Sequence, residues 1–425
     1  MGSLRDKIPE FYDLELRAAE ILQVQEERGF YFDEKAAWEL TSTLEEELRQ
    51  ISGVLQQRHP FVAGPSFTPS RTIKTRGYIA GAPFTRLTEL NISSRDHISW
   101  VLQKHYGWKP TKTTTTGKPV IDEVVLEKLA EDVPVAKIFL RSLTIKKILG
   151  MMSQGGNAWL KLCTKNRIHH HCSTATNTFR CAHRKPNLGQ IPSDKQYRAL
   201  FIPTPGMDLV GADLSGIELR CLAHFLARYD GGKYADILLN GDIHQVNADK
   251  IGITRKQVKT VTYAFLYGAG DKKIGLSYDD KLSPNKAAAK GKEIRDAFVQ
   301  AIDGLDKLLD AVECASKEGS LKLLDGRRIL LDSSHKSLNY LLQGTAAVLA
   351  KRWMVIAHEN IKQLGLEAHQ LAFVHDELQF ETYPPNVNDL CTSLVLSAAK
   401  AGEYYKFRVP IDAEANHGKS WAETH

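Results

Sequence analysis

Residues 371–380 read LAFVHDELQF, in which two apolar segments flank His375, Asp376 and Glu377. This pattern is typical of two buried strands joined by a tight turn, with the charged residues where the chain reverses. Burying a carboxylate costs free energy unless it is paired or bound to a metal ion. The segment therefore predicts a β-hairpin whose tip carries a chemical function.

A second strand-like segment also ends in a carboxylate. Residues 208–220 read DLVGADLSGIELR: an apolar strand reaches Asp213, and a helix begins soon after it, with Glu218 on its first turn. A single aspartate at a strand end is more often a helix cap or an ion-pair partner. If this strand neighbours the hairpin, however, Asp213 meets Asp376, and two like charges are tolerated where Mg²⁺ ions lie between them. The two segments together predict a two-metal site.

A helical segment supplies groups suited to a nucleotide. In RKQVKTVTYAFLYGAG (residues 255–270), Arg255, Lys259, Tyr263 and Tyr267 recur every four residues. This spacing places the four side chains along one helix face. Cations suit phosphate oxygens, and aromatic rings suit a base or a sugar. For this segment alone, a solvated basic face with two core tyrosines is the alternative.

The composition limits the class of protein. The chain has 425 residues, a net charge of +6, 43% hydrophobic residues and six cysteines without a CxxC pair. This length predicts two or three subdomains, and no apolar run is long enough to span a membrane. The charged N-terminus is unlike a signal peptide, and the scattered cysteines favour a reducing cytoplasm. The His- and Cys-rich segment 168–183 raises the question of zinc, but its spacing favours a polar loop.

The hydrophobic periodicity predicts an α+β protein. Helical stretches alternate with mixed stretches of short strands and turns. A segment rich in Pro, Gly, Ser and Thr interrupts the N-terminal helices. The expected elements are helices over 8–57, 93–107, 122–154 and 217–315, an exposed loop over 58–87, short strands and turns over 158–213, a hairpin over 321–332 and a long helix over 337–365.

The three functional segments resemble the motifs of family A DNA polymerases. DLSGIELR is similar to motif A, RKQVKTVTYAFLYGAG to motif B and VHDE to motif C. PNLGQIP (residues 186–192) and HKSLNYLLQ (residues 335–343) resemble the two segments of the family that contact primer and template. The resemblance covers nearly the whole chain. Phrases such as GIELRCLAHFLARYDGGKY and FLYGAGDKKIG are most similar to the phage branch, the replicative polymerases of short-tailed T-odd bacteriophages.

The resemblance implies a right-hand polymerase fold with a thumb, a palm and fingers. The thumb is expected over residues 1–157, with a shortened insertion loop at about 58–87. The palm is expected over 158–228 and 338–425, around an antiparallel sheet, and the helical fingers over 229–337.

The resemblance also implies the roles of individual residues. Asp213, Asp376 and the carbonyl of Leu214 are expected to hold two Mg²⁺ ions, which Mn²⁺ can replace. The catalytic set is Asp213, Asp376 and Lys259, the last as proton donor to pyrophosphate. The nucleotide site is expected to contain Arg255, Lys259, Tyr263, His244, Glu218, Ser215 and Gly216. Contacts with DNA are expected from Arg180, Asn187, Gln190, Tyr267, His335, Asn339, Gln343 and Glu377.

Two of these roles concern the choice of nucleotide. Tyr263 is expected to stack by the incoming sugar and base. Glu218 is expected to exclude a ribose 2′-hydroxyl, partly through a hydrogen bond to Tyr263.

Three departures from the family pattern matter. Phe179 stands where the family's Thr-Gly-Arg has glycine, which puts the placement of Arg180 in question. The thumb insertion that binds host thioredoxin in the phage branch is much shorter here, so we do not expect a thioredoxin-type partner. The chain begins where the branch's proofreading domain would end. The one early DxE, Asp13-Leu14-Glu15, is interpreted as helix surface, so we expect no 3′–5′ exonuclease.

The expected function is template-directed DNA synthesis from dNTPs on a primer-template, in phage genome replication. The expected state is a monomer without membrane association in the cytoplasm (the host's, if phage-encoded), with a replicative helicase-primase as a further partner. One alternative is a single-subunit phage-type RNA polymerase, which Glu218 disfavours because that enzyme must admit the 2′-hydroxyl. The other is a catalytically silent nucleic-acid-binding scaffold of the replisome, which the complete set of metal ligands and phosphate-binding cations disfavours.

Overall fold

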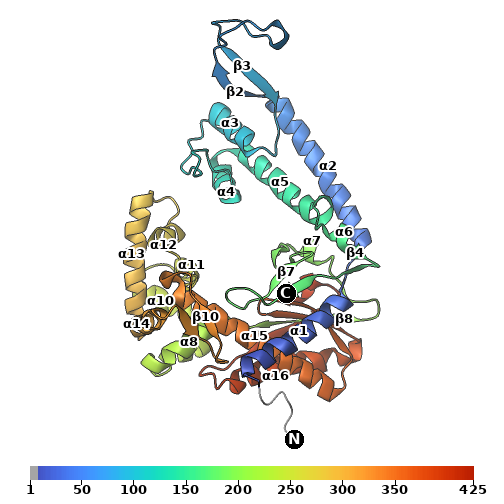
Figure 1. Cartoon of the computed structure of the whole chain (residues 1–425), viewed down its shortest axis with the longest axis vertical. Coiled ribbons are helices and arrows are strands. Elements are labelled where there is room, and N and C mark those ends of the chain that lie inside the picture. The colour runs from blue at the N-terminus through green and yellow to red at the C-terminus, as the bar shows by residue number, and fades with distance from the viewer. Residues whose placement is uncertain (1–7) are drawn as a thin grey trace. The chain divides into compact units, whose positions relative to one another are not determined.

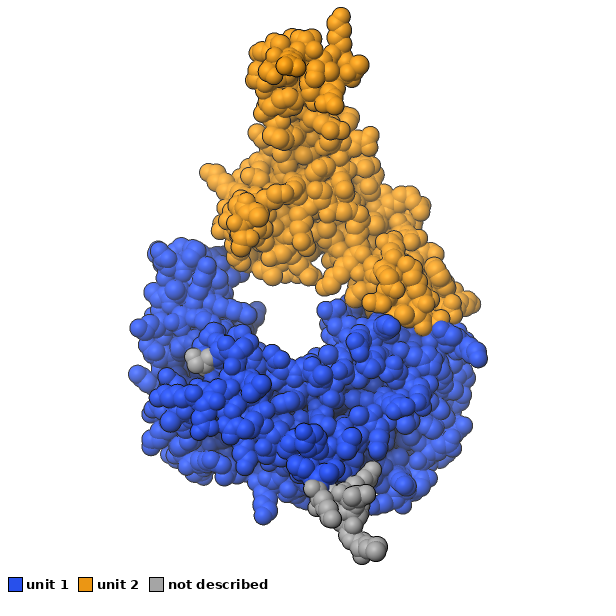
Figure 2. Space-filling model, in the orientation of Figure 1, with its two compact units in different colours: residues 1–32, 164–425 blue, residues 33–163 orange. Residues whose placement is uncertain are grey.

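The structure is a computed structural model that describes residues 8–425. The chain divides into two compact units, which Figure 2 distinguishes by colour. The first unit comprises residues 1–32 and 164–425, and the second comprises residues 33–163. Each has its own hydrophobic core, so each is described by itself.

The second unit is mostly helical. Its first helix follows Asp33, whose side chain accepts a hydrogen bond from the Ala36 backbone N–H at 2.9 Å, as an N-cap does. Its core contains Leu55, Val101 and Phe139, none of them exposed. The elements are α2 (Glu34–Arg58), β2 (Phe61–Phe67), β3 (Phe84–Glu89), α3 (Arg95–Tyr106), α4 (Glu123–Asp132), α5 (Pro134–Leu149), a π-helical turn (Gly150–Gln154) and α6 (Trp159–Leu162).

The segment predicted as an exposed loop at 58–87 is exposed, but it contains a β-hairpin. Strands β2 and β3 pair antiparallel, with an irregular register between Ala63 and Ser66. Three aromatic rings near the turn support the hairpin: Phe67, Tyr78 and Phe84 have ring centroids 4.7–5.7 Å apart. The loop prediction was wrong because Pro and Gly interrupt the alternation that marks a strand.

The first unit is built around one antiparallel sheet. Its strand order is β11-β12-β8-β13, with β11 (Ala368–Val374), β12 (Glu377–Thr382), β8 (Asp208–Leu214) and β13 (Ala413–Gly418). Helix α16 (Val387–Tyr404) packs on β8 and β13, and against the long helix α15 (Ser337–Leu364). Figure 1 shows α15 and α16 in orange and red beside the sheet. The predicted hairpin and long helix are thereby confirmed.

The remaining helices of the first unit follow β8 in the chain. Helix α11 is capped by Thr254 in a capping box, in which the side chains of Thr254 and Gln257 each accept a hydrogen bond from the other's backbone N–H. The helices are α1 (Glu10–Arg28), α7 (Lys195–Arg198), α8 (Ile217–Asp230), α9 (Lys233–Asn240), α10 (Ile243–Ile251), α11 (Arg255–Leu266), α12 (Asp271–Tyr278), α13 (Pro284–Ala301), α14 (Leu305–Ser316) and α17 (Trp421–Thr424).

Short strands complete the first unit, as the sequence predicts for 158–213 and 321–332. These strands are β1 (Phe30–Tyr31), β5 (Arg167–Ile168), β6 (His171–Ser173), β7 (Ala182–Arg184), β9 (Ser320–Lys322) and β10 (Arg328–Leu330). Strand β4 (Cys163–Thr164) begins at the last residue of the second unit. The β9–β10 hairpin turns at Asp325-Gly326, where Gly326 has φ +85°.

Helix α1 lies with the first unit because it packs on α15 and β11. The expected thumb, 1–157, and the second unit, 33–163, therefore begin at different residues. The surface interpretation of the early DxE is wrong for Glu15. Its carboxylate accepts hydrogen bonds at 2.5 Å from Lys351 and Arg327, both nearly fully buried.

Within residues 8–425, no helix combines the length and the apolar character that crossing a membrane requires.

Candidate active site

The sheet register brings the two predicted aspartates to one edge of the sheet. Strand β12 pairs with β8 so that Glu377 lies opposite Asp213. At the hairpin tip, the backbone N–H of Leu214 donates to the carbonyl of Asp376 at 3.0 Å. The tip is a tight turn in which His375 has φ +60°. The prediction that the strands carrying Asp213 and Asp376 are neighbours is confirmed.

Strand β8 is closely packed where it delivers Asp213. At Gly211, an added Cβ would lie 2.3 Å from the side-chain nitrogen of Gln379 and 2.4 Å from the carbonyl of Thr424. Only glycine therefore lets the C-terminal helix α17 approach the centre of the strand. This close approach brings the end of the chain to the edge where Asp213 lies.

Both aspartates are destabilised in their ionised form. The pKa of Asp213 is raised to about 7, mainly by burial and then by the charges of Asp376 and Glu377. The pKa of Asp376 is raised to about 6, mainly by burial and then by the charge of Glu218. Two neighbouring carboxylates with raised pKa values form a site that favours a cation.

Glu377 is buried and has three hydrogen-bond donors. These are the indole N–H of Trp421 at 2.5 Å, the side chain of Gln379 at 2.7 Å and Nδ1 of His425 at 2.8 Å. The hydrogen bond to Glu377 is the main cause of the raised pKa of His425. Glu377 is thus fixed in the protein and not free at the tip.

His425 was missed by the sequence analysis. Among the described residues, one group of three metal-binding side chains stands out: Asp213, Glu377 and His425 offer ligand atoms within 4.8 Å of one another. No local pattern signals His425, because Asp213 is 212 positions away and only the folded sheet brings the two together.

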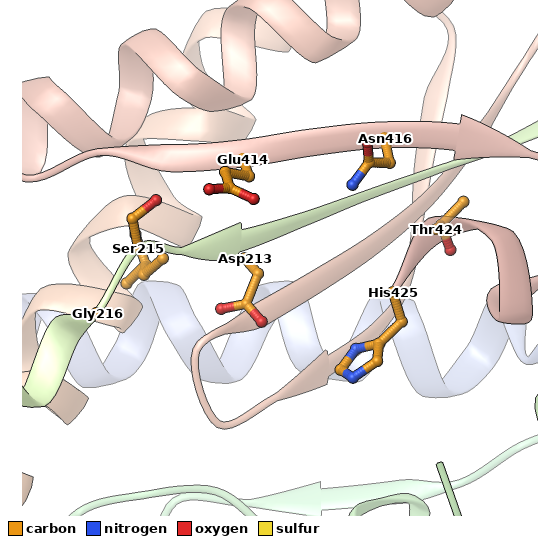
Figure 3. A pocket seen from close by; sticks show the side chains of 8 residues that line it. Asp213, Ser215, Gly216, Glu414, Asn416, Thr424 and His425 are labelled. Atoms are coloured by element: carbon orange, nitrogen blue, oxygen red, sulfur yellow. The ribbon is translucent and has the colours of Figure 1, made fainter. Parts of the chain in front are cut away.

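A pocket of about 320 Å³ opens beside Asp213. Figure 3 shows its lining, with the side chain of Asp213 from β8, that of Glu414 from β13 and that of His425 after α17. Leu214, Ser215 and Gly216, predicted from motif A, line the same pocket. The complete lining is Asp213, Leu214, Ser215, Gly216, Glu414, Asn416, Thr424 and His425.

Helix α11 presents the predicted stripe. Arg255, Lys259 and Tyr267 are exposed and Tyr263 is partly buried, whereas the opposite face of the helix is buried in the core. The stripe follows from the four-residue spacing, since residues that lie four apart share a helix face. The alternative of two core tyrosines is excluded for Tyr267, which is 45% exposed.

Asp242 connects two residues of the predicted phosphate site. One carboxylate oxygen accepts the backbone N–H groups of His244 and Gln245 at 3.1 Å, as an N-cap of α10. The other accepts from Nε of Arg255 at 2.7 Å. The pKa of Asp242 is lowered, first by the hydrogen bond from Arg255. Sequence reasoning missed Asp242, although an aspartate just before a helix is a recognisable cap signal.

Glu218 lies between α11 and the segment that carries Arg180. Its carboxylate accepts from the Tyr267 hydroxyl at 3.2 Å and from the Arg180 guanidinium at 3.0 Å. The expected hydrogen bond to Tyr263 is therefore replaced by one to Tyr267, the residue at which α11 ends. The residues of motif A and motif B nevertheless meet at Glu218.

The residues expected to contact DNA lie on five segments of the first unit, one of which is PNLGQIP (residues 186–192). Gln190 is exposed, and Asn187 accepts from the backbone N–H of Gly189 at 3.0 Å. Gly189 lies near the hairpin tip, because a Cβ added there would be 3.5 Å from the ring of His375. The PNLGQIP segment thus adjoins the tip that carries Asp376.

The HKSLNYLLQ segment adjoins the end of α11. The side chain of Asn339 donates to the carbonyl of Leu266 at 3.1 Å, and an added Cβ at Gly268 would lie 3.7 Å from the carbonyl of His335. His335 is exposed and Gln343 is partly buried. These contacts place the segment beside motif B.

The side chains of the His- and Cys-rich segment (168–183) contact different partners. His169 and His171 contact Glu26, and His170 is buried against the carbonyl of Leu371. Cys172 and Cys181 are neighbours in the core.

Comparison with protein families decides the assignment. The profile described as DNA polymerase family A matches residues 79–423. The chain belongs to DNA polymerase family A. This confirms the family and the enzyme class, DNA-directed DNA polymerase, that the sequence predicts.

Family A relatives with similar sequences include two phage enzymes. The DNA-directed DNA polymerases of Enterobacteria phage T3 and Escherichia phage T7 are each 33% identical over 98% of this chain and 70% of their own length. DNA polymerase I of Pseudomonas aeruginosa is 28% identical over 79% of this chain and 39% of its own length.

A solved structure with the same fold supports the right-hand architecture. It is the POL domain of Pol1 from M. smegmatis, in complex with DNA primer-template and dNTP. The match has a TM-score of 0.78 at 24% identity, and it covers 96% of this chain and 70% of that one. The α+β, right-hand polymerase fold is thus confirmed.

Phe179, where the resemblance to the family predicts glycine, has the backbone that glycine favours. Phe179 has φ +61°, in the left-handed region. Arg180 is nevertheless directed at Glu218.

Proposed function

We propose that this chain extends a DNA primer on a DNA template, joining the primer 3′-hydroxyl to the α-phosphate of a matched dNTP and releasing pyrophosphate. One observation carries the proposal: the sheet register pairs the strand that carries Asp213 with the strand that follows Asp376. The hydrogen bond between Glu218 and Tyr267 then joins this edge to the cationic stripe of α11.

Family A polymerases use divalent metal ions, and the residues of this chain fit them. Asp213, Asp376 and the carbonyl of Leu214 offer the oxygen ligands that Mg²⁺ prefers. The raised pKa values of both aspartates indicate that burial and the neighbouring carboxylates outweigh the positive charges of His425 and Arg180. When bound, two Mg²⁺ ions, or Mn²⁺ in their place, supply activation of the primer hydroxyl and stabilisation of the leaving phosphate.

The cations of the fingers hold the triphosphate. Arg255 keeps its terminal nitrogens available while Asp242 binds its Nε, so the guanidinium is oriented. Lys259 lies one turn along the same exposed face and donates a proton to the departing pyrophosphate. His244, at the start of α10, reaches a phosphate oxygen.

The sugar is selected beside Glu218. The carboxylate, 18% exposed, occupies space that a ribose 2′-hydroxyl would need, and Tyr263 stacks on the incoming nucleotide. Ser215 and Gly216 line the pocket of Asp213 and contact the same nucleotide. The residues that hold the primer-template are Arg180, Asn187, Gln190, Tyr267, His335, Asn339, Gln343 and Glu377.

The biological setting proposed is phage genome replication, since the relatives from phages T3 and T7 align over 98% of the chain. We assign the chain to the host cytoplasm as a monomer that works with a replicative helicase-primase. We also propose that residues 1–157 form the thumb, residues 158–228 and 338–425 the palm, and residues 229–337 the fingers.

The test is extension of a labelled primer on a DNA template with Mg²⁺, comparing dNTPs, rNTPs and EDTA. Growth with dNTPs that EDTA abolishes supports the proposal. Tight DNA binding without growth supports the silent scaffold, and equal use of rNTPs supports the RNA polymerase. End-labelled primer without nucleotides serves as the control for exonuclease activity.

A further inference from the structure

Phe179 occupies a backbone conformation that its side chain disfavours. At φ +61° its Cβ crowds the following carbonyl oxygen, a clash that glycine avoids. The surrounding structure must therefore supply an interaction that holds Phe179 in place. Its backbone N–H donates to Thr176, but that bond is independent of the side chain at 179.

The interaction with the Phe179 side chain comes from Arg327. The guanidinium carbon lies 4.8 Å from the centroid of the Phe179 ring, within the range of a cation–π contact. The ring also packs against the hydrophobic core of the first unit. An aromatic ring at this position thus has both an apolar and a cationic neighbour.

Arg327 is itself held rigidly. It is 5% exposed, and its guanidinium donates to Asp325 at 2.6 Å and to Glu15 at 2.5 Å. Lys351 donates to the same Glu15 oxygen at 2.5 Å. The charges of Arg327 and Lys351 are therefore balanced by two carboxylates, those of Asp325 and Glu15. The Arg327 guanidinium, which faces Phe179, has a fixed position.

The position of Phe179 determines where the next residue points. Arg180 follows it directly, and its carbonyl accepts from the Thr176 hydroxyl at 2.7 Å. The Arg180 guanidinium then reaches Glu218 at 3.0 Å. A change of φ at Phe179 would turn Arg180 away from Glu218.

We propose that Phe179, held by its contact with Arg327, is a positioning residue that directs Arg180 into the polymerase site, at a position where the resemblance to the family predicts glycine. The inference rests on the proposed function, because Arg180 is a DNA-contacting residue only in that setting. The contact between the aromatic ring and a fixed cation here holds the left-handed backbone that glycine would adopt without strain.

The test compares three substitutions by steady-state primer extension. Phe179→Tyr keeps the aromatic face and should stay within about twofold of wild type in kcat/KM. Phe179→Leu keeps the strained backbone without the aromatic face and should lose about tenfold, equivalent to ~1.4 kcal/mol. Phe179→Gly loses the ring but relieves the backbone, and should recover most of that loss.

A double-mutant cycle distinguishes positioning from general stability. In an Arg180→Ala background, Phe179→Leu should change kcat/KM by less than about twofold, because the residue that it positions is absent. Arg327→Lys keeps the charge of the buried network but not its planar face. Arg327→Lys should therefore lower kcat/KM when Phe179 is present, but it should change kcat/KM little in the Phe179→Gly background.

Each outcome of these experiments either supports or overturns the proposed role of Phe179. Equal activity of the Leu and Tyr variants overturns the proposal, and so does an equal loss from Phe179→Leu with and without Arg180. If Phe179→Leu fails to fold, the Arg327→Lys pair still decides by the same comparison. A wild type that does not extend primers refutes the proposed function, whereas extension with no difference among the variants refutes only this inference.

Discussion

Asp213→Asn should abolish primer extension and at the same time stabilise the metal-free protein. The substitution removes a metal ligand and leaves a side chain of nearly the same size. It also removes a charge that burial and Asp376 disfavour, which is why the pKa of Asp213 is raised from 3.8 to about 7. Because the ionised carboxylate of Asp213 destabilises the fold, deleting its charge should raise the stability of the protein.

The magnitude follows from the linkage between protonation and folding. A raised folded-state pKa gives stability below pH 3.8 that is lost as pH rises through 7, at ~1.4 kcal/mol per pH unit, or about 4 kcal/mol at pH 8. Asp213 is partly exposed, and solvent screening reduces this to about 2 kcal/mol. For a unit of roughly 300 residues, this corresponds to a rise of about 3 °C in the unfolding midpoint.

The assay is thermal unfolding in EDTA at pH 8 and at pH 4. Asp213→Asn should melt higher than wild type at pH 8, and the difference should nearly disappear at pH 4, where the wild-type carboxyl is largely protonated in the folded protein. Added Mg²⁺ should raise the wild-type midpoint more than that of the variant, because ions that bind only the folded state stabilise it.

The matched control is Asp208→Asn, at the start of the same strand. Asp208 pairs with the exposed side chain of Lys419, so its loss should lower stability by at most about 1 kcal/mol. A lower midpoint for Asp213→Asn than for wild type at pH 8 in EDTA would refute the reasoning. Retained primer extension would remove Asp213 from the metal site.

Four further predictions test individual residues. Glu218→Ala should admit ribonucleotides, measured as the ratio of rNTP to dNTP incorporation; an unchanged ratio would exclude Glu218 as the sugar gate. The wild type should accept dideoxynucleotides readily and Tyr263→Phe should discriminate against them, so strong rejection by the wild type would contradict the role of the hydroxyl. Lys259→Ala should lower the single-turnover rate constant by about 10²–10⁴-fold, because the lysine is the proposed proton donor. A change in KM alone would restrict the role of Lys259 to nucleotide binding. The pKa of His183 is lowered to about 3 by burial and then by the charges of His170 and His375. Stability should therefore fall as pH drops below 6.5, and His183→Phe should flatten that dependence in pH-resolved unfolding; an unchanged slope would count against a neutral, buried ring.

Local patterns in the sequence predicted most of the elements that build the site. Short continuous apolar runs identify the hairpin at Asp376 and the strand at Asp213, because a strand that is buried on both faces is apolar at successive positions. The four-residue spacing of Arg255 and Lys259 fixes their common helix face for a similar reason. These predictions succeed because the information lies within a few residues of the position concerned.

The contacts that were missed depend on distant residues. His425 joins Glu377 only because Gly211 lets α17 approach the sheet, which no local pattern shows. Glu15 looks like surface in its own helix, and its two cationic partners lie more than 300 positions away. Which tyrosine Glu218 bonds depends on the side-chain conformation, and the spacing of the residues leaves that undecided.

The pairing of β8 with β12 also determines where the chain tolerates insertions. Successive side chains of a strand point to opposite faces, so one extra residue between Asp208 and Asp213 would turn the carboxylate away from Asp376. The same insertion in the exposed turn between β2 and β3 would leave the two aspartates in place. Length should therefore be more strictly constrained than composition in β8, and a library of single-codon insertions should lose activity most sharply within this strand.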